Sequence, residues 1–425
     1  MKNKLLLTSF LLLLALWSCW SWILVNPNLL FTSWAPYVSW QTWWQETFYQ
    51  QRPLVTAMYL SLLILLFVNY CLLAKNLPAV NQRSCLWLSI LVTLPLFFAY
   101  NALSSDVFNY LFNAKMVIHY HDNPHVHTAL DYQQDDWVRF MHNIHTPAPY
   151  GYGYTLVSLL PFVLGLGKLL PTWLSFRLFN VGLWLASIAS LLYFYQHLRQ
   201  DLPSARFWWL IFNPLLLLEL IGNIHNDLWM ILPALWSLYW IYPQPSSKKS
   251  RWQIVTSALC LVFSASIKYA TLALLPLWLW AWWQNYPQTL NKLSRRLTLE
   301  WQKFWAQTLA WINFYFFDLC TLAMFLPLLT DRAQRFHPWY LSWSLMFLPL
   351  TRSRITLVSL VILSLSAMSR YAPYLWFNEF TPGVLLGQQL MTLLPVAIYW
   401  LVVAGQWVIT HRHDNCVRKH TQKVV

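Results

Sequence analysis

Four short polar clusters interrupt the otherwise apolar sequence, and each holds residue types that can do chemistry. They are residues 104–110 with Asp106, residues 213–227 ending in His-Asn-Asp, the single Lys268, and residues 331–340 with two Arg and one His. An ionisable side chain inside a membrane costs about 2.5 to 3.5 kcal/mol on insertion scales, so a residue of this kind in an apolar chain points to a function. Each cluster is therefore a candidate part of a functional site.

The clusters contain the groups that a site for a phosphate-bearing substrate needs. Planar guanidinium groups bind phosphate through two parallel hydrogen bonds, and an ammonium group adds a point charge. A carboxylate can take a proton from a reacting hydroxyl. The candidates are Asp106 and Asp227 as carboxylates, His225 and Asn226 as polar partners, and Lys268, Arg332 and Arg335 as cations, with Arg370 as a further one.

Several of these residues also have a purely structural interpretation. Asp106 and Asp227 each stand where Asp commonly caps the first turn of a helix. Lys268 could extend its charge to the lipid headgroups, as long basic side chains near helix ends do. Glu219, two turns before the His-Asn-Asp corner, could be the buried partner of an Arg such as Arg177.

The composition places these clusters in a membrane protein. Of the 425 residues, 58% are apolar and 10% are charged, whereas about a quarter of the residues in a soluble domain are charged. This excludes a soluble globular enzyme, and it excludes a disordered chain, which would be poor in apolar residues. The formal charge of +14 indicates orientation in the lipid bilayer and not a nucleic-acid partner, because most basic residues fall in the segments predicted to be cytoplasmic.

Apolar segments that could cross a membrane recur along the whole chain. A spanning helix needs about 17 to 25 residues, because backbone polar groups cannot be left unpaired in hydrocarbon. The candidates are Leu5–Val25, Leu54–Ala74, Cys85–Leu103, Tyr154–Leu170, Leu174–Gln196, Phe207–Ile221, His225–Tyr242, Trp252–Ile267, Tyr269–Gln284, Gln307–Leu329, Pro338–Leu350, Ile355–Ser369 and Gly383–Ile409. We expect 12 of these 13 to cross, with Tyr154–Leu170 as the exception because Pro161 interrupts it.

The distribution of Lys and Arg predicts which loops face the cytoplasm. Basic residues gather near the N-terminus, in the loop 285–306 and in the tail 410–425, which are therefore expected inside, whereas the acidic loop 104–153 is expected outside. In this topology all four polar clusters lie on the outer side. The chain is predicted to be one polytopic, all-α membrane domain, 1–425, with a Trp-rich interfacial segment at 26–53.

The order of the motifs resembles that of a known enzyme family. The matching stretches are Asp106-x-x-x-Tyr110, Asp122-Asn123-Pro124, Pro147-x-Pro149-Tyr150-Gly151, Asn213-Pro214, Glu219, Gly222-Asn223-x-His225-Asn226-Asp227, Lys268 and His337-Pro-Trp-Tyr-Leu-x-Trp343. Over about residues 85 to 345, the chain resembles the GT-C superfamily of polyprenyl-phosphate-sugar-dependent glycosyltransferases, in its bacterial mannosyltransferase-like branch. The resemblance implies a bundle of about 12 to 13 transmembrane segments in a bacterial inner membrane, with a catalytic cavity on the non-cytoplasmic face.

The same resemblance implies a reaction and roles for the candidate residues. A hexose, plausibly mannose, would pass from a polyprenyl-phosphate donor to a glycan or glycolipid acceptor, with inversion at the anomeric carbon and without a metal or other cofactor. Asp106 would be the general base and Asp227 would position the acceptor. The substrate-binding residues would be Tyr110, His225, Asn226, Lys268, Arg332, Arg335, His337 and Tyr340.

A transporter or flippase for a lipid-linked saccharide is the first alternative. Such a protein would use the same cations and the same cavity without needing the carboxylate of Asp106. Transporters often show repeated halves, and the sequence shows no convincing internal repeat.

A membrane protein that handles metal ions is the second alternative. Six of the 12 histidines lie in the loop 104–153, namely His119, His121, His125, His127, His142 and His145. Neutral imidazole suits zinc and copper, but alternate residues share a face only on a strand. The sequence leaves the sugar, the acceptor and the linkage open.

Overall fold

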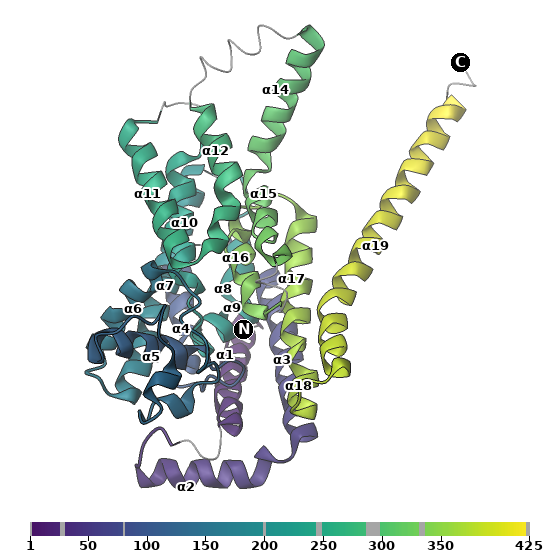
Figure 1. The fold of residues 1–425 in the computed structure, drawn as a ribbon. Helices are drawn as coiled ribbons and strands as arrows, with labels where there is room; N and C mark the ends of the chain where they lie inside the picture. The colour runs from purple at the N-terminus through teal and green to yellow at the C-terminus, as the bar shows by residue number, and fades with distance from the viewer. Residues whose placement is uncertain are drawn as a thin grey trace.

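The structure is a computed structural model that describes residues 2–25, 30–79, 81–198, 201–243, 249–285, 298–330 and 336–421, with side chains as far as residue 409. All regular secondary structure in these ranges is helical, and most helices run roughly along the long axis of the molecule (Figure 1). The predicted fold class, an all-α membrane helix bundle, is confirmed.

Five helical stretches are long and apolar enough to cross a membrane. They are α1 (Lys2–Ser21) with its short extension to Leu24, α3 (Arg52–Asn76), α7 (Leu169–Leu198), α17 (Arg354–Ser369) with α18 (Tyr371–Phe377), and the apolar part of α19 (Pro382–Thr421). Two bent pairs of helical segments are also long and apolar enough to cross a membrane when each pair is taken together. In the first, α9 (Pro214–Leu216) and η6 (Leu217–Gly222) meet α10 (Asp227–Ile241) at 117°. In the second, α14 (Leu299–Phe314) meets the following α15 (Phe316–Ala323) and η8 (Leu326–Leu329) at 71°. The described residues therefore hold five to seven spans of full length.

Fewer segments reach membrane length than the 12 expected spans, because several apolar runs are broken. Residues 85–103 form α4 (Gln82–Leu91) and a short 3-10 turn, η3 (Leu94–Leu96). Residues 338–350 form η10 (Pro338–Leu341), α16 (Ser342–Leu345) and η11 (Leu348–Leu350) instead of one helix. The segment expected not to cross is α6 (Tyr152–Leu164), whose 13 residues fall short of the roughly 20 that a span needs. Apolar composition marks buried backbone as well as spans, and hydropathy alone does not separate the two.

The deepest part of the molecule is the bent segment that precedes α10. Every residue from 210 to 231 is buried. Asn213 begins α9, because its Oδ1 accepts a hydrogen bond from the backbone N–H of Leu216 and Pro214 suits the first helical position. The helix then widens into the π-helix η6, a form that occurs often at functional sites. It ends near Ile224, whose φ of 57° is strained for a β-branched residue.

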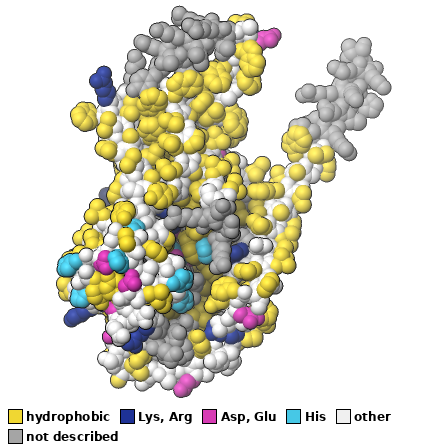
Figure 2. Space-filling view, viewed as in Figure 1, with side chains coloured by type: hydrophobic (Ala, Val, Ile, Leu, Met, Phe, Trp, Pro, Cys, Tyr) yellow, Lys and Arg dark blue, Asp and Glu magenta, His cyan; other side chains and the backbone are white. Residues whose placement is uncertain are grey.

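The loop expected outside forms a compact lobe. It contains α5 (Asp106–His119), η4 (Ala129–Tyr132) and η5 (Val138–Phe140), and it leads into α6. Lys115 and Tyr120 both bind Asp135, at 2.5 and 2.7 Å, and Tyr132 donates to Asp122. His and acidic side chains gather on this lobe, whereas the upper part of the same face is mostly hydrophobic (Figure 2). These contacts hold the residues that follow α5 in the lobe against one another and against Lys115 of α5.

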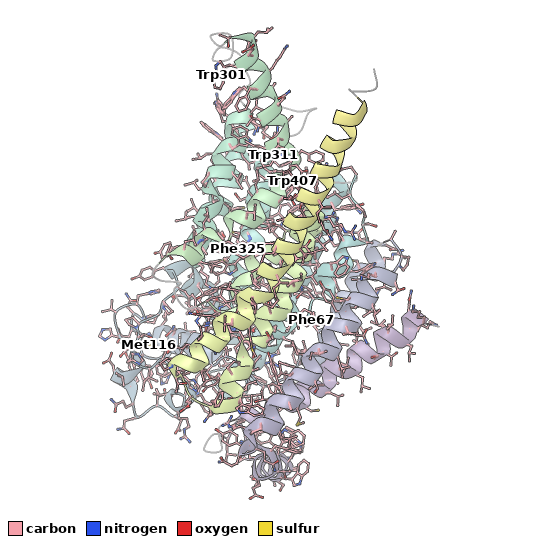
Figure 3. The ribbon with its side chains drawn as sticks, turned by 90° about the vertical axis from the view of Figure 1, so that its right-hand side faces the viewer. Phe67, Met116, Trp301, Trp311, Phe325 and Trp407 are labelled. Carbon is pink, nitrogen blue, oxygen red and sulfur yellow. The ribbon has the colours of Figure 1, made fainter. Side chains whose placement is uncertain are left out.

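Two peripheral helices expose large apolar side chains. The helix α2 (Ala35–Trp44) lies crosswise at the lower end of the molecule in Figure 1, with Trp43 54% exposed, as expected for an interfacial helix. The helix α19 packs on α17 and α18 and then leans away from the body. Trp407 lies on this outlying part (Figure 3) and is 62% exposed. Lipid chains would cover such surfaces in a bilayer.

Candidate active site

Residues from three of the four polar clusters, and the described part of the fourth, meet beside one cavity. The cavity has a volume of about 230 Å³. Asp106, Lys268, His337, Trp339 and Tyr340 contribute to its lining, together with residues from the outer lobe. These residues come from α5, from the end of α11 (Arg251–Ile267) and from η10, so the fold joins parts of the chain more than 200 positions apart.

Asp106 is the carboxylate that reaches this cavity. It is the first residue of α5, Ser105 holds the N-cap position before it, and the Asp106 side chain lines the cavity. The hydroxyl of Tyr150 donates to Asp106 Oδ2 at 3.4 Å, and 22% of the Asp106 side chain is exposed. Burial raises the pKa of the Asp106 carboxyl above its usual value, and the neighbouring His225 and Lys268 partly offset this effect.

Asp227 and Lys268 form a buried ion pair next to the cavity. Lys268 Nζ lies 2.7 Å from Asp227 Oδ1, and the indole N–H of Trp343 donates to the same oxygen at 2.5 Å. Asp227 is completely buried, and its other oxygen, Oδ2, has no hydrogen-bond partner among the described residues. Asn226 precedes α10 and its side chain does not cap that helix, although its Oδ1 lies 3.4 Å from Lys268 Nζ.

Aromatic rings surround the ammonium group of Lys268. Its Nζ lies 5.2 Å from the ring centre of Tyr150, 5.4 Å from that of Trp343 and 5.8 Å from that of Tyr340. Aromatic faces attract cations, and Asp227 balances the charge. Lys268 is therefore directed inward to a carboxylate and not outward to lipid headgroups, and it lines the cavity. Its predicted contact with the substrate phosphate stays a prediction.

His225 lies between Asp106 and the buried carboxylate of Glu219. Its ring is completely buried and stacks on Trp339, with 3.8 Å between ring centres. His225 Nδ1 lies 3.9 Å from Asp106 Oδ2, and Nε2 lies 3.2 Å from Glu219 Oε2. The predicted partner of Glu219 was wrong: Arg177 donates to the backbone carbonyls of residues 96, 97 and 222, and Glu219 pairs with His225.

The segment around Gly151 brings Tyr150 to the site. The backbone N–H of Gly151 donates to the carbonyl of Ile267 at 3.0 Å, which places Tyr150 beside Lys268. The hydroxyl of Tyr110 lies 3.2 Å from that of Tyr150, so the predicted residue Tyr110 contacts Tyr150 and is absent from the cavity lining. A Cβ atom on Gly151 would lie only 2.0 Å from the carbonyl oxygen of Ser266.

Replacement of Gly151 by Ala is therefore expected to destabilise the protein by about 1 to 3 kcal/mol, the usual cost of overpacking. The end of α11 would have to move, and Lys268 would move with it. Thermal unfolding of the purified protein measures the effect. Gly182→Ala in α7 is the matched control, because a Cβ atom there meets nothing within 4 Å. A melting temperature equal for both variants would contradict the expected crowding.

The last cluster is only partly described. Arg332 and Arg335 lie outside the described residues. His337 and Tyr340 line the cavity, and His337 stacks on Trp339 with 4.3 Å between ring centres. Their role in substrate binding stays a prediction. Trp339 thus separates two imidazole rings, those of His225 and His337.

Several residues that the structure places at the site are not among the candidates predicted from the sequence. Tyr150 and Trp343 belong to matched motifs, but nothing in their spacing shows that they contact Asp106 and Asp227. Asn109 and Asn113 line the cavity. Their positions, three and seven residues after Asp106, put them on the same face of a helix, and this spacing is a signal that could have found them.

The histidines of the outer lobe do not assemble into a metal site in the described part of the chain. His127 lies 3.4 Å from Asp122 and from Asp131. No group of three or more His, Cys, Asp or Glu side chains that could hold a metal ion occurs among the described residues.

Comparison with known proteins gives one family match. A family model described as alpha-(1->6)-mannopyranosyltransferase, N-terminal domain, matches residues 8–284. The matched range includes Asp106, His225, Asp227 and Lys268, and it ends before His337. No curated protein and no solved structure matches the chain.

Proposed function

Because the chain belongs to the alpha-(1->6)-mannopyranosyltransferase family, a family of membrane glycosyltransferases, we propose that it moves mannose from a polyprenyl-phosphate donor to a hydroxyl group of a glycan or glycolipid. The observation that supports this most strongly is the position of Asp106. Its carboxylate borders a cavity that can admit an acceptor, and buried charged groups surround its other side. A transporter would not need a carboxylate at this point.

In the proposed reaction, Asp106 acts as the general base. The acceptor oxygen attacks the anomeric carbon of the donor sugar, and its proton passes to an Asp106 oxygen. The bond between the anomeric carbon and the phosphate oxygen breaks, and the electron pair leaves with the phosphate. This single displacement inverts the anomeric carbon, so an α-linked product requires a β-linked donor. A base of this kind contributes about 10²- to 10⁴-fold to a rate.

The donor phosphate is proposed to lie between the cavity and Arg370. This residue follows α17 and is half-buried, and Nη1 contacts Thr392 Oγ1 at 3.4 Å. Its guanidinium group lies 5.8 Å from the ring centre of Phe336, at the start of the segment that contains His337. Because Asp227 already balances Lys268, Arg370 is the better-placed described cation for the charge that develops on the leaving phosphate. The hydrophobic helix surfaces nearby suit a polyprenyl chain.

The acceptor is proposed to occupy the outer half of the cavity. The polar groups there are neutral: the amides of Asn109, Asn113 and Asn143 and the hydroxyl of Thr146. Asn109 Oδ1 is buried without a hydrogen-bond partner in the described structure. Amides can both donate to and accept from sugar hydroxyl groups, whereas a phosphate would call for cations. The seven positions from Asp106 to Asn113 cover about 10 Å along the helix.

Asn113→Ala is expected to raise the KM for the acceptor about five- to tenfold, with kcat nearly unchanged. The change removes one or two hydrogen bonds, each with a net value of about 1 kcal/mol, far from the reacting atoms. Initial rates at varied acceptor concentration measure it. Gln134→Ala is the control, because Gln134 is exposed on the same lobe and does not line the cavity. An unchanged KM in Asn113→Ala would remove the acceptor from this half of the cavity.

The proposed function is tested with purified protein, a mannoside acceptor and polyprenyl phosphate carrying radiolabelled mannose. We expect labelled acceptor to form from this donor and not from a sugar nucleotide. Labelled product with a sugar nucleotide alone would overturn the proposed donor, and no labelled product with either donor would overturn the transferase proposal. The non-cytoplasmic position of the site is part of the proposal, and the basic residues in 285–306 and 410–425 support it.

A further inference from the structure

The buried Glu219 has no role in the reaction described above, although only the ring of His225 separates it from the proposed base, Asp106. Glu219 is completely buried in η6, and His225 stands between it and Asp106. Two further groups hold its carboxylate: Asn223 Nδ2 donates to Oε2 at 2.9 Å, and the hydroxyl of Tyr371 donates to Oε1 at 2.9 Å. A carboxylate is rarely kept at such a depth unless it is paired.

The geometry around His225 favours one charge state of its ring. Its two nitrogens face two carboxylates, Nε2 at 3.2 Å from Glu219 and Nδ1 at 3.9 Å from Asp106. Both nitrogens are buried and neither makes a hydrogen bond with a described residue, so the two contacts are ion-pair distances and not hydrogen bonds. An opposite charge within about 4 to 6 Å favours the charged form of a titratable group. Two carboxylates at these distances therefore favour an imidazolium over a neutral ring.

We propose that Glu219 is a positioning residue that keeps His225 protonated, and that the resulting imidazolium keeps Asp106 ionised and ready to accept the proton of the acceptor. This inference rests on the proposed role of Asp106 as the base. Asp106 is partly desolvated, which by itself favours its protonated, inactive form. A fixed cation on its buried side opposes that tendency without occupying the cavity.

The other charged and titratable groups near this unit do not replace the imidazolium. Asp227 and Lys268 face Asp106 from the side of α10 and α11, and they balance each other. Tyr150 contacts Asp106 as a neutral donor, and Tyr110 lies behind it. On the far side, Tyr371 and Tyr59 are the titratable groups near Glu219, and His337 is separated from His225 by Trp339. Arg177 of α7 is a buried cation that donates to the backbone carbonyl of Gly222 at the end of η6, and not to Glu219. His225 is thus the cation whose charge depends on Glu219.

The pH dependence of kcat/KM for mannose transfer by Glu219→Gln tests this inference. Loss of the Glu219 charge should leave His225 neutral, and Asp106 should then lose its neighbouring cation and hold its proton to higher pH. We therefore expect the acidic limb of the profile to move upward by about one pH unit, with the acceptor KM unchanged and most of the rate recovered at higher pH. Glu219→Asp should return the limb toward its original position.

If Glu219 has only a structural role, Glu219→Gln should lower the yield or the melting temperature and leave the acidic limb of the pH profile where it was. That result would overturn the inference. If Glu219→Gln does not fold, Tyr371→Phe provides the second variant, because it removes one hydrogen bond from Glu219 and keeps all charges. It should shift the limb in the same direction by a smaller amount. An unmoved limb in Tyr371→Phe would then count against the inference.

The charge of His225 can also be measured without turnover. In protein labelled with ¹⁵N-histidine, solid-state NMR distinguishes an imidazolium from a neutral ring, and the signal that is absent from His225→Asn identifies the residue. We expect imidazolium at neutral pH in the natural sequence and a neutral ring in Glu219→Gln. A neutral ring in both would contradict the inference even if transfer is observed. If His225 is an imidazolium but no mannose transfer occurs, the inferred effect of Glu219 on His225 stands and the proposed function is rejected.

Discussion

Asp106→Asn is expected to reduce kcat for mannose transfer by about 10²- to 10⁴-fold, the usual contribution of a positioned general base. Asparagine has the same shape as aspartate, but its amide cannot take the proton of the acceptor hydroxyl. The donor and acceptor KM values should change little, because the cavity keeps its size. Initial-rate measurements with labelled polyprenyl-phosphate mannose give both parameters.

The control for this variant is Asp136→Asn. Asp136 belongs to the same lobe, its side chain is 84% exposed, and its only recorded partner in the described structure is the neighbouring Arg139. We expect Asp136→Asn to keep the natural rate and the natural melting temperature. Full activity of Asp106→Asn would reject Asp106 as the base, and equal losses in both variants would show a general effect of charge on the lobe.

Lys268→Met is expected to lower the free energy of unfolding by about 3 to 5 kcal/mol, the typical result of removing one partner of a buried ion pair. The change leaves Asp227 charged and completely buried, with Trp343 as its remaining donor. The loss should appear as a lower melting temperature of the detergent-purified protein and as a smaller monodisperse fraction in size-exclusion chromatography.

The double variant Asp227→Asn/Lys268→Met separates the pair from other effects of each residue. Since no unpaired charge remains, we expect it to be more stable than Lys268→Met alone, although it carries one more substitution. Strictly additive losses would show that the two side chains do not depend on each other. If Lys268→Met keeps its stability and raises the donor KM, Lys268 is a phosphate contact and not a structural cation.

The membrane class and the general location of the site could be predicted because both depend on local sequence. The low charge and the apolar runs follow from the solvent that the chain must enter. Asp106, His225, Asp227 and Lys268 could be expected to lie together because each follows or precedes an apolar segment at the same predicted side. The family match over residues 8–284 supports the resemblance that these motifs indicated.

The number of full-length spans could not be predicted in the same way. Residues 207–221 and 225–242 are apolar enough for two helices, but residues 214–222 and 227–241 within them form two limbs of one bent pair that meet at 117°. Hydropathy records that a segment avoids water, and both lipid and protein satisfy that condition. Whether such a segment crosses the membrane or turns back depends on what packs around it.

The sequence alone therefore determined the fold class and the set of chemical groups near the site, because burial in a membrane and the chemistry of a side chain are properties of short stretches. Only the tertiary structure decided how these groups are paired. Lys268 binds Asp227, Trp343 donates to Asp227 from 116 positions away, and Glu219 pairs with His225 rather than Arg177. Each pairing depends on distances of a few ångströms between distant segments, because charged groups interact strongly only at such short range in a buried site.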